Sequence, residues 1–233
     1  MGEESVNAVN SADGLELIAA LDQGDNVSEV ITSQQVDVVV DFTHPSCVFE
    51  NAVSIINAGA RPVIGTTGLA DQQLSEIHDL ANSNELGAMV CPNFAIGAVL
   101  MMKYAAEAAK YLPNVEIIEM HHDQKADAPS GTAIKTAELI SELNPNINPD
   151  LERLRDTELI KGSRGGDRNR IPIHSIRLPG YVAHQEVIFG GLGQTLTLRH
   201  DTINRESFMP GVVLACKKVM TLKGLTYGLE HVL

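Results

Sequence analysis

The chain has 233 residues, of which 44 % are hydrophobic and 20 % are charged, a composition typical of one large folded domain or two small ones. Its formal net charge is −13 at pH 7, and so acidic a protein would repel a phosphate backbone. Aromatic residues make up only 4 % and Trp is absent, so side chains that stack on bases are scarce. We therefore expect no nucleic-acid partner.

Cysteine usage and apolar stretches indicate the compartment. Three widely spaced cysteines without a CxxC pair favour a reducing environment and offer no zinc framework. The longest apolar stretch, around residues 95–102, is too short to span a bilayer. Glu3 and Glu4 stand where an export signal would need an apolar core. We expect a cytoplasmic protein with no membrane partner.

Short apolar runs alternate with helical patterns over the first hundred residues. We expect strands at residues 15–21, 36–41, 62–64 and 88–91, with helices between the later ones. The run at 36–41 is rich in valine, which suits a strand buried on both faces. Strands separated by helices of this length predict βαβ units and a parallel sheet.

The second half has a different pattern. Polar and apolar residues alternate in three predicted strands at 171–177, 184–189 and 195–200, after a strand at 115–121 and a helix at 131–143. This indicates an antiparallel or mixed sheet with one face covered by helices. A glycine- and arginine-rich loop spans 163–170, and a closing helix spans 207–220. The change of pattern near Ala95 predicts an α/β nucleotide domain followed by an α+β substrate domain.

The densest polar cluster lies in residues 119–132. Two adjacent histidines end the predicted strand, Lys125 follows, and Pro-Ser-Gly-Thr opens the predicted helix. Ser130 is a candidate N-cap, and the backbone N–H groups of Gly131 and Thr132 can cradle an anion. Lys125 can grip a carboxylate or donate a proton, and a histidine can act as a general acid near neutral pH. A capped loop with solvated charges explains the same residues equally well.

Three further segments are candidates for contact with a dinucleotide. Gly65, Thr66, Thr67 and Gly68 follow a strand, where small residues let a ligand approach the backbone. Asp22 ends the predicted strand 15–21, the place of the acid that holds ribose hydroxyls. The 91–94 loop offers an amide and a ring to a nicotinamide. The alternative readings are a glycine-rich turn, a turn residue and a buried loop anchor.

Other chemistries have little support in the sequence. The remaining histidines show no metal-ligand spacing, so we expect no metal site. There is no G-x-S-x-G elbow, which argues against a serine hydrolase. The 163–170 loop is interpreted as a flexible lid or an interface segment, with a phosphate-type loop as the alternative.

Taken together, the segments resemble the dihydrodipicolinate reductases, also called 4-hydroxy-tetrahydrodipicolinate reductases, of the lysine (diaminopimelate) pathway. The string His-His-x-x-Lys-x-Asp-x-Pro-Ser-Gly-Thr at residues 121–132 is specific to that family. Further matches run in family order over nearly the whole chain, at residues 38–45, 63–68, 92–97, 171–180, 183–190 and 207–211.

The resemblance implies a fold, a reaction and a cofactor. The implied fold is a Rossmann-type dinucleotide-binding domain (1–95 and 205–233) with an α+β substrate-binding and oligomerisation domain (96–204) that assembles a homotetramer. The implied reaction is hydride transfer from NADH or NADPH to C4 of the ring that forms after loss of water from 4-hydroxy-tetrahydrodipicolinate. An enzyme proton then completes the reduction.

The resemblance also implies roles for individual residues. His121 falls on the catalytic histidine and Lys125 on the catalytic lysine. Substrate contacts fall on His122, Lys125, Ser130, Gly131, Thr132 and Thr67. Cofactor contacts fall on Asp22, Gly65, Thr66, Thr67, Cys91, Pro92, Asn93 and Phe94. Because Gln23 stands where an Arg would favour a 2′-phosphate, we expect NADH to be preferred and NADPH tolerated.

One departure from the family pattern concerns the N-terminus. The family opens with a strand and a G-x-x-G-x-x-G turn that wraps the cofactor pyrophosphate. Here Met1 and Gly2 align with the last glycine of that turn, and residues 3–11 are expected to form the first helix. A truncated start is our interpretation. The competing hypothesis is a non-catalytic dicarboxylate-binding oligomer with a damaged nicotinamide site.

Overall fold

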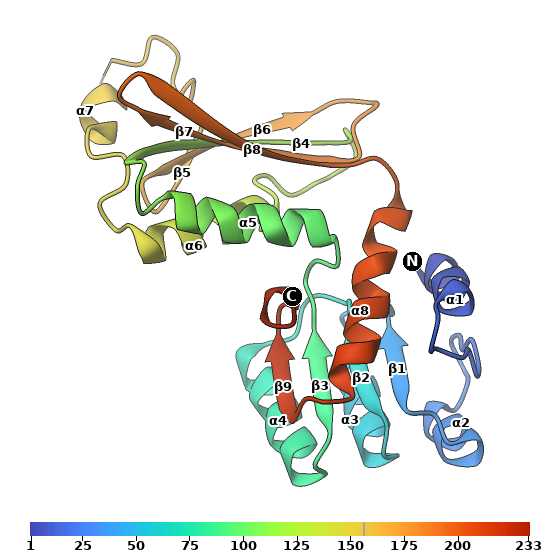
Figure 1. The fold of residues 1–233 in the computed structure, drawn as a ribbon. Helices are drawn as coiled ribbons and strands as arrows, with labels where there is room; N and C mark the ends of the chain where they lie inside the picture. Colours follow the sequence, from blue (N-terminus) through green and yellow to red (C-terminus); the bar gives the residue numbers. More distant parts are fainter. Residues whose placement is uncertain (156) are drawn as a thin grey trace. The chain divides into compact units, whose positions relative to one another are not determined.

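The computed structural model describes residues 1–155 and 157–233 and divides the chain into two compact units. Unit 1 comprises Met1–Ile96 and Arg205–Leu233, and unit 2 comprises Gly97–Asn204 (Figure 1). The functional roles assigned to these two parts of the chain stay a prediction. None of the helices in the described residues is long and apolar enough to cross a membrane.

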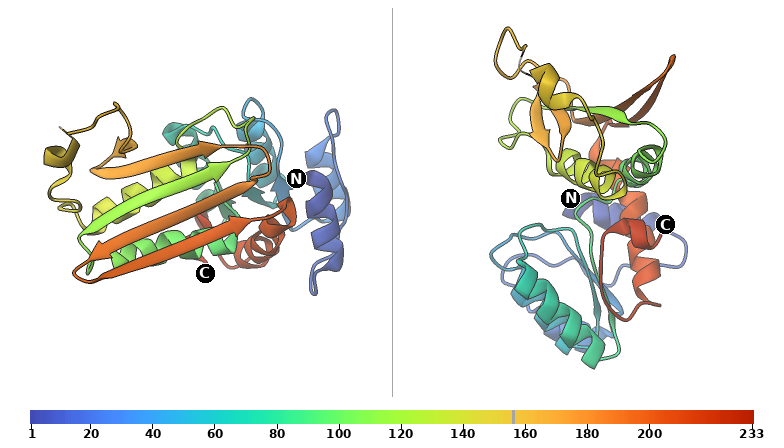
Figure 2. Two further views of the ribbon diagram at one scale, coloured as in Figure 1. Left: turned by 90° about the horizontal axis from the view of Figure 1, so that it is seen from above. Right: turned by 90° about the vertical axis from the view of Figure 1, so that its left-hand side faces the viewer.

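Unit 1 is built on a parallel sheet with strand order β1-β2-β3-β9. The strands are β1 (Val38–Asp41), β2 (Arg61–Ile64), β3 (Gly87–Val90) and β9 (Gly224–Tyr227). Helices α3 (Val48–Asn57) and α4 (Asp71–Ser83) cover one face, and α8 (Met209–Val219) covers the other (Figures 1 and 2). The predicted α/β class with a parallel sheet is confirmed.

The core of unit 1 follows from helical spacing. Val48, Ala52 and Ile56 recur along one face of α3 and are fully buried. They pack against Ile64 of β2 and Ile77 of α4 in one apolar cluster. This packing fixes the carboxyl ends of β1 and β2 at one edge of the sheet, where a ligand of an open α/β sheet is expected to bind.

Two strand predictions in unit 1 are wrong. Residues 15–21 form no strand and are mostly exposed between α1 (Gly2–Ser11) and α2 (Val27–Gln34). In the part of the chain that the structure describes, β1 pairs only with β2, so its valines are half-buried rather than buried on both faces. A strand is stable only beside a hydrogen-bonded neighbour, and among the described residues the run at 15–21 has none. Strand β9 was not predicted.

Unit 2 is a five-stranded sheet with order β5-β6-β4-β7-β8. Strands β4 and β6 are parallel and the other pairs are antiparallel. The strands are β4 (Asn114–His121), β5 (Gly166–Arg168), β6 (Ile171–Arg177), β7 (Ala183–Gly191) and β8 (Gln194–Thr202). Helices α5 (Ile96–Ala108) and α6 (Gly131–Leu143) cover one face, and Figure 2 shows the other face free of helices. The predicted mixed sheet is confirmed.

Of the two long helices of unit 2, the sequence pattern predicted α6 but not α5. Helix α6 begins and ends where predicted, and Ser130 sets its start by accepting a hydrogen bond from the Ala133 N–H as an N-cap. Helix α5 was not predicted, since its alanine- and methionine-rich run is apolar on most sides and lacks a clear period. The remaining short elements are α7 (Leu151–Arg155) and the 3-10 turns η1 (Arg205–Phe208) and η2 (Leu229–His231).

Candidate active site

His121 ends β4 on the same face as Glu119, because side chains two residues apart on a strand point the same way. Glu119 is fully buried and the His121 side chain is 13 % exposed. The Nδ1 atom of His121 lies 2.5 Å from the Oε2 atom of Glu119. The imidazole is therefore held at one nitrogen, and in the described residues its other nitrogen has no hydrogen-bond partner.

Arg177, the last residue of β6, grips the Glu119 carboxylate with both terminal nitrogens at 2.9 and 2.8 Å. The backbone N–H of Ser130 donates to the same carboxylate at 3.3 Å. Burial by itself raises the pKa of Glu119, but hydrogen bonds from His121, Arg177 and Ser175 outweigh it and hold the pKa at about 2. Glu119 is therefore ionised at neutral pH and can only accept hydrogen bonds.

Lys125 follows on the loop after β4. Its Nζ atom lies 2.7 and 2.9 Å from the two carboxylate oxygens of Asp127, and this bond lowers the pKa of Asp127. The backbone carbonyl of Asp127 accepts a hydrogen bond from Arg177 at 2.7 Å. A continuous chain of contacts thus runs from His121 through Glu119, Arg177 and Asp127 to Lys125.

The N-terminus of α6 completes this cluster. The Ser130 hydroxyl, which is buried, serves as the helix cap. Gly131 is exposed, with open space where a side chain would stand, and Thr132 is half-buried. His122 is exposed beside the loop. All the substrate-contact residues predicted in this segment therefore lie on one strand end, one loop and one helix start.

The low pKa of Glu119 leads to a prediction about acid stability. Because the folded-state pKa is about 2 against an ordinary value of 4.5, Glu119 stabilises the fold above pH 4.5 and this contribution is lost as the pH falls towards 2. This lowering of the Glu119 pKa adds about 3 kcal/mol to the free energy of unfolding at neutral pH, of which about 2 kcal/mol is lost by pH 3.

Between pH 5 and pH 3, we expect the free energy of unfolding of the wild type to fall by about 2 kcal/mol more than that of Glu119→Gln. Urea unfolding at several pH values measures this dependence, and Glu119→Gln combined with Arg177→Gln serves if the single variant does not fold. Equal slopes in the two proteins would contradict a lowered pKa.

The predicted cofactor segment in unit 1 is organised around Asp41, a buried carboxylate at the end of β1. Its Oδ1 atom accepts hydrogen bonds from the Thr66 hydroxyl at 2.9 Å and from the Thr43 N–H and hydroxyl at 2.9 and 2.7 Å. Asn51 of α3 donates to Oδ2 at 2.9 Å. Asp41 thus ties the loops after β1 and β2 together, and the Thr66 hydroxyl is occupied by this role.

The loops after β2 and β3 contain both buried and solvent-exposed residues. Gly65 lies against Phe42, since an added Cβ would stand 2.1 Å from the ring, so packing alone requires glycine here. Thr67 is exposed. In the loop after β3, Phe94 is buried and meets Phe42 edge-on at 5.6 Å between ring centroids.

The rest of the loop after β3 has structural roles of its own. Asn93 accepts a hydrogen bond from the Ala95 N–H, and Pro92 is exposed. Burial raises the pKa of the Cys91 thiol to about 12, so it stays a neutral thiol. Asp22 lies on an exposed turn in which it accepts from the Gln23 N–H.

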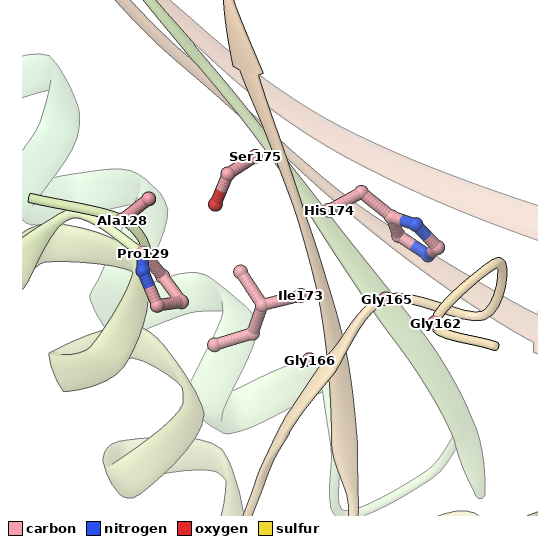
Figure 3. Close-up of a pocket in the computed structure, with 8 residues that line it drawn as sticks. All are labelled: Ala128, Pro129, Gly162, Gly165, Gly166, Ile173, His174 and Ser175. Carbon is pink, nitrogen blue, oxygen red and sulfur yellow. The ribbon is translucent and has the colours of Figure 1, made fainter.

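A cavity of about 370 Å³ lies beside the His–Lys loop rather than at it. Ile173 and Ser175 point from β6 towards Ala128 and Pro129, and His174 points to the other side of the strand (Figure 3). None of the predicted site residues lines this cavity. In the described residues no group of histidine, cysteine and acidic side chains could hold a metal ion.

Glu119, Arg177, Asp127 and Asp41 were not predicted as functional residues. One signal was present for Glu119: a charged residue at a core-facing position of the alternating strand 115–121 needs a partner. No local signal pointed to Arg177, because its partner lies 58 residues away in the chain.

The fold and the site together define the chain as a Rossmann-type α/β oxidoreductase with a second, α+β unit. The model of "Dihydrodipicolinate reductase, N-terminus" matches residues 1–94, and that of "Dihydrodipicolinate reductase, C-terminus" matches residues 97–233. The chain therefore belongs to the dihydrodipicolinate reductase family.

Individual relatives agree with this assignment. The 4-hydroxy-tetrahydrodipicolinate reductase of Syntrophomonas wolfei is 51 % identical over all of this chain and 94 % of its own length. The 4-hydroxy-tetrahydrodipicolinate reductase of Coxiella burnetii is 51 % identical over all of this chain and 95 % of its own length. Among solved structures, a dipicolinate-bound dihydrodipicolinate reductase from Paenisporosarcina sp. TG-14 is 47 % identical, with a TM-score of 0.91 over all of this chain and 95 % of its own.

Proposed function

We propose that this chain reduces 4-hydroxy-tetrahydrodipicolinate to tetrahydrodipicolinate in lysine and diaminopimelate biosynthesis, with a nicotinamide dinucleotide as the hydride donor. The observation that carries the proposal is the buried Glu119–His121 pair linked through Arg177 to the Lys125 loop. This cluster stands in a chain whose full-length relatives bear the name of that reductase. Their names do not favour the competing non-catalytic oligomer.

The substrate clamp is assigned to the Lys125 loop and the start of α6. A dicarboxylate needs positive charge in an acidic protein, and Lys125 offers an ammonium group that is 24 % exposed. Backbone N–H groups of Gly131 and Thr132, at the positive end of the helix dipole, suit a carboxylate. The Ser130 hydroxyl and the His122 ring are proposed to complete the contacts within unit 2, and the substrate contact of Thr67 stays a prediction. A relative with dipicolinate bound supports a small dicarboxylate ligand.

His121 is proposed as the proton donor. Because Nδ1 is bound to an ionised carboxylate, Nε2 is the nitrogen left to face a ligand. When the hydride reaches C4 of the ring that forms after loss of water, the electron pair of the reduced double bond takes a proton. His121 donates this proton from Nε2 as an imidazolium, keeps its second proton on Nδ1 towards Glu119, and then regains a proton at Nε2 from water. Lys125 positions the substrate and stabilises the developing negative charge.

The cofactor is assigned to unit 1. The nicotinamide group supplies the hydride; the protein binds and orients it at the carboxyl ends of β2 and β3. The backbone of the 65–67 loop and the loop formed by Cys91, Pro92, Asn93 and Phe94 are proposed to contact it. The Asp41 hydrogen bonds support this, because they hold the 65–67 loop in a fixed conformation. Asp22 is proposed to bind the ribose hydroxyls, with NADH preferred over NADPH.

Assembly and location are part of the same proposal. We expect a homotetramer assembled through the sheet of unit 2, whose β8 exposes Leu196 and whose connecting turn exposes Leu192. Exposed apolar side chains on a sheet without a helix cover favour contact with another copy. The cytoplasm is the expected compartment.

The direct test is oxidation of NADH, followed at 340 nm, with freshly prepared 4-hydroxy-tetrahydrodipicolinate. Calorimetry with dipicolinate and with NADH accompanies the assay. We expect turnover that depends on both substrates. Tight binding of dipicolinate without NADH binding or turnover would contradict the reductase and support the non-catalytic oligomer.

Asp22→Ala tests the cofactor assignment. Loss of charge-assisted hydrogen bonds to the ribose is expected to raise the KM for NADH about 10- to 100-fold. The KM for NADPH should change less, because the carboxylate also repels a 2′-phosphate. Asp13→Ala removes another exposed carboxylate of unit 1 and is the matched control. An unchanged KM for NADH in Asp22→Ala would remove Asp22 from the cofactor site.

A further inference from the structure

Glu119 is a buried charge that follows two apolar side chains on the covered face of β4. Val115 and Ile117, at the alternate positions before it on β4, are buried apolar side chains. Burying a carboxylate is costly unless every oxygen is paired, so such a group is retained where it performs a task. In a protein that needs only packing, an apolar side chain at this position would serve as well.

The contacts of Glu119 suggest what that task is. Its Oε2 atom is shared between His121 Nδ1 and Arg177, and its Oε1 atom between Arg177 and the Ser130 N–H. The carboxylate thus meets the end of β4, the end of β6 and the start of α6 at once. An ionised carboxylate accepts only, so the Nδ1 atom of His121 must carry the proton. Nε2 is then the nitrogen that faces away from the buried pair.

Arg177 neutralises Glu119 and also fixes the Lys125 loop. Its Nη2 atom donates to the Asp127 carbonyl at 2.7 Å as well as to Glu119. Its side chain is 17 % exposed, so both ends of the ion pair are largely shielded from water. One guanidinium group therefore sets the distance between the imidazole and the loop that carries Lys125.

We propose that Glu119, held by Arg177, is the positioning residue that fixes the tautomer and the orientation of His121, and that Arg177 couples this histidine to the Lys125 loop. The inference rests on the proposed function, in which His121 donates a proton. Neither residue needs to touch the substrate. The effect of Glu119 is on the rate of proton donation and not on the strength of substrate binding.

The test measures kcat and KM in Glu119→Gln. The neutral amide can present its NH₂ group to Nδ1 and so favour the wrong tautomer. We expect kcat to fall at least about 100-fold, as for loss of a general acid, with the KM for the dicarboxylate substrate within about threefold. Rescue is expected from Glu119→Asp only in part, because the shorter carboxylate keeps the charge but not the reach.

Glu119→Gln alone leaves Arg177 as a buried unpaired charge and can prevent folding. The double variant Glu119→Gln with Arg177→Gln removes both charges, and replacement of a complete buried ion pair is far better tolerated. We expect the double variant to stay folded and to keep the low kcat. A double variant within about threefold of the wild-type kcat would overturn the proposal.

Glu116→Gln is the matched control. Glu116 lies on the same strand and also pairs with a histidine, His174, at 2.8 Å, but this pair is largely exposed. We expect kcat and KM of this variant to stay within about twofold of the wild type. A loss of kcat as large as that in Glu119→Gln would mean a general sensitivity of the sheet and would overturn the specific role of Glu119.

Nitrogen NMR of the histidine side chains separates positioning from catalysis. The His121 signal is assigned by its absence in His121→Gln. Under conditions in which the ring is neutral, we expect its proton on Nδ1 in the wild type and a shift towards Nε2 protonation in the double variant. The same tautomer in both proteins would overturn the proposal. Because this readout needs no turnover, it decides the role of Glu119 even if the wild-type chain proves to lack reductase activity.

Discussion

Replacement of His121 by Gln is expected to lower kcat by about 10²- to 10³-fold, while the Kd for dipicolinate stays within about threefold. A general acid contributes about 10²- to 10⁴-fold to a rate, and hydride transfer with water as the proton source accounts for the activity that remains. Glutamine can still donate a hydrogen bond to Glu119, so the buried ion pair with Arg177 keeps its environment.

Steady-state NADH oxidation measures kcat, and calorimetry with dipicolinate measures binding. His174→Gln is the matched control, because His174 also lies on the sheet of unit 2 and pairs with a carboxylate, Glu116. We expect its kcat to stay within about twofold of the wild type. Unchanged turnover in His121→Gln would remove His121 from the proton-donor role and would leave Lys125 as the remaining candidate.

Replacement of Lys125 by Met is expected to weaken both binding and turnover. Methionine keeps most of the aliphatic stem but removes the ammonium group. A hydrogen bond to a charged group is worth about 1.5–3 kcal/mol, so the Kd for dipicolinate should rise about 10- to 100-fold. Because the same charge stabilises the transition state, kcat/KM should fall further, by about 10²- to 10⁴-fold. This pattern differs from that of His121→Gln, in which binding is kept.

Lys110→Met is the matched control for Lys125. Lys110, just after the end of α5, also forms an ion pair within unit 2: its Nζ atom lies 2.8 Å from the carboxylate of Glu107. We expect its Kd and kcat/KM to stay within about twofold of the wild type. A Lys125→Met variant with unchanged affinity for dipicolinate would contradict the clamp and would assign Lys125 a structural role with Asp127.

Local signals made much of the candidate site predictable. The strand end at His121, the loop of Lys125 and the Ser130 cap are set by residues within a dozen positions, so periodicity and capping rules predict them. The family resemblance in residues 121–132 supplied the proposed roles. Helix α6 was placed at its observed ends for the same local reason.

Features that depend on distant parts of the chain were missed. Residues 15–21 have the composition of a strand, yet in the described residues no neighbouring strand pairs with them. Strand β9 pairs with β3, which lies more than 130 positions earlier in the sequence, and no local pattern predicts such a pairing. The Asp41 and Thr66 contact joins two loops that are 25 residues apart.

In residues 119–132, some features of the site follow from the sequence alone and others depend on the tertiary structure. The sequence by itself determined that two histidines, a lysine and a capped helix start stand in close succession, and hence that an acid and an anion clamp can be neighbours. Only the tertiary structure decided that Glu119 is buried, ionised and shared between His121 and Arg177. The physical reason is that parallel pairing of β4 with β6 places Arg177 directly opposite His121, although the two residues are 56 positions apart in the chain. A buried carboxylate keeps its charge only where an oppositely charged side chain lies beside it, and Arg177 is that side chain for Glu119.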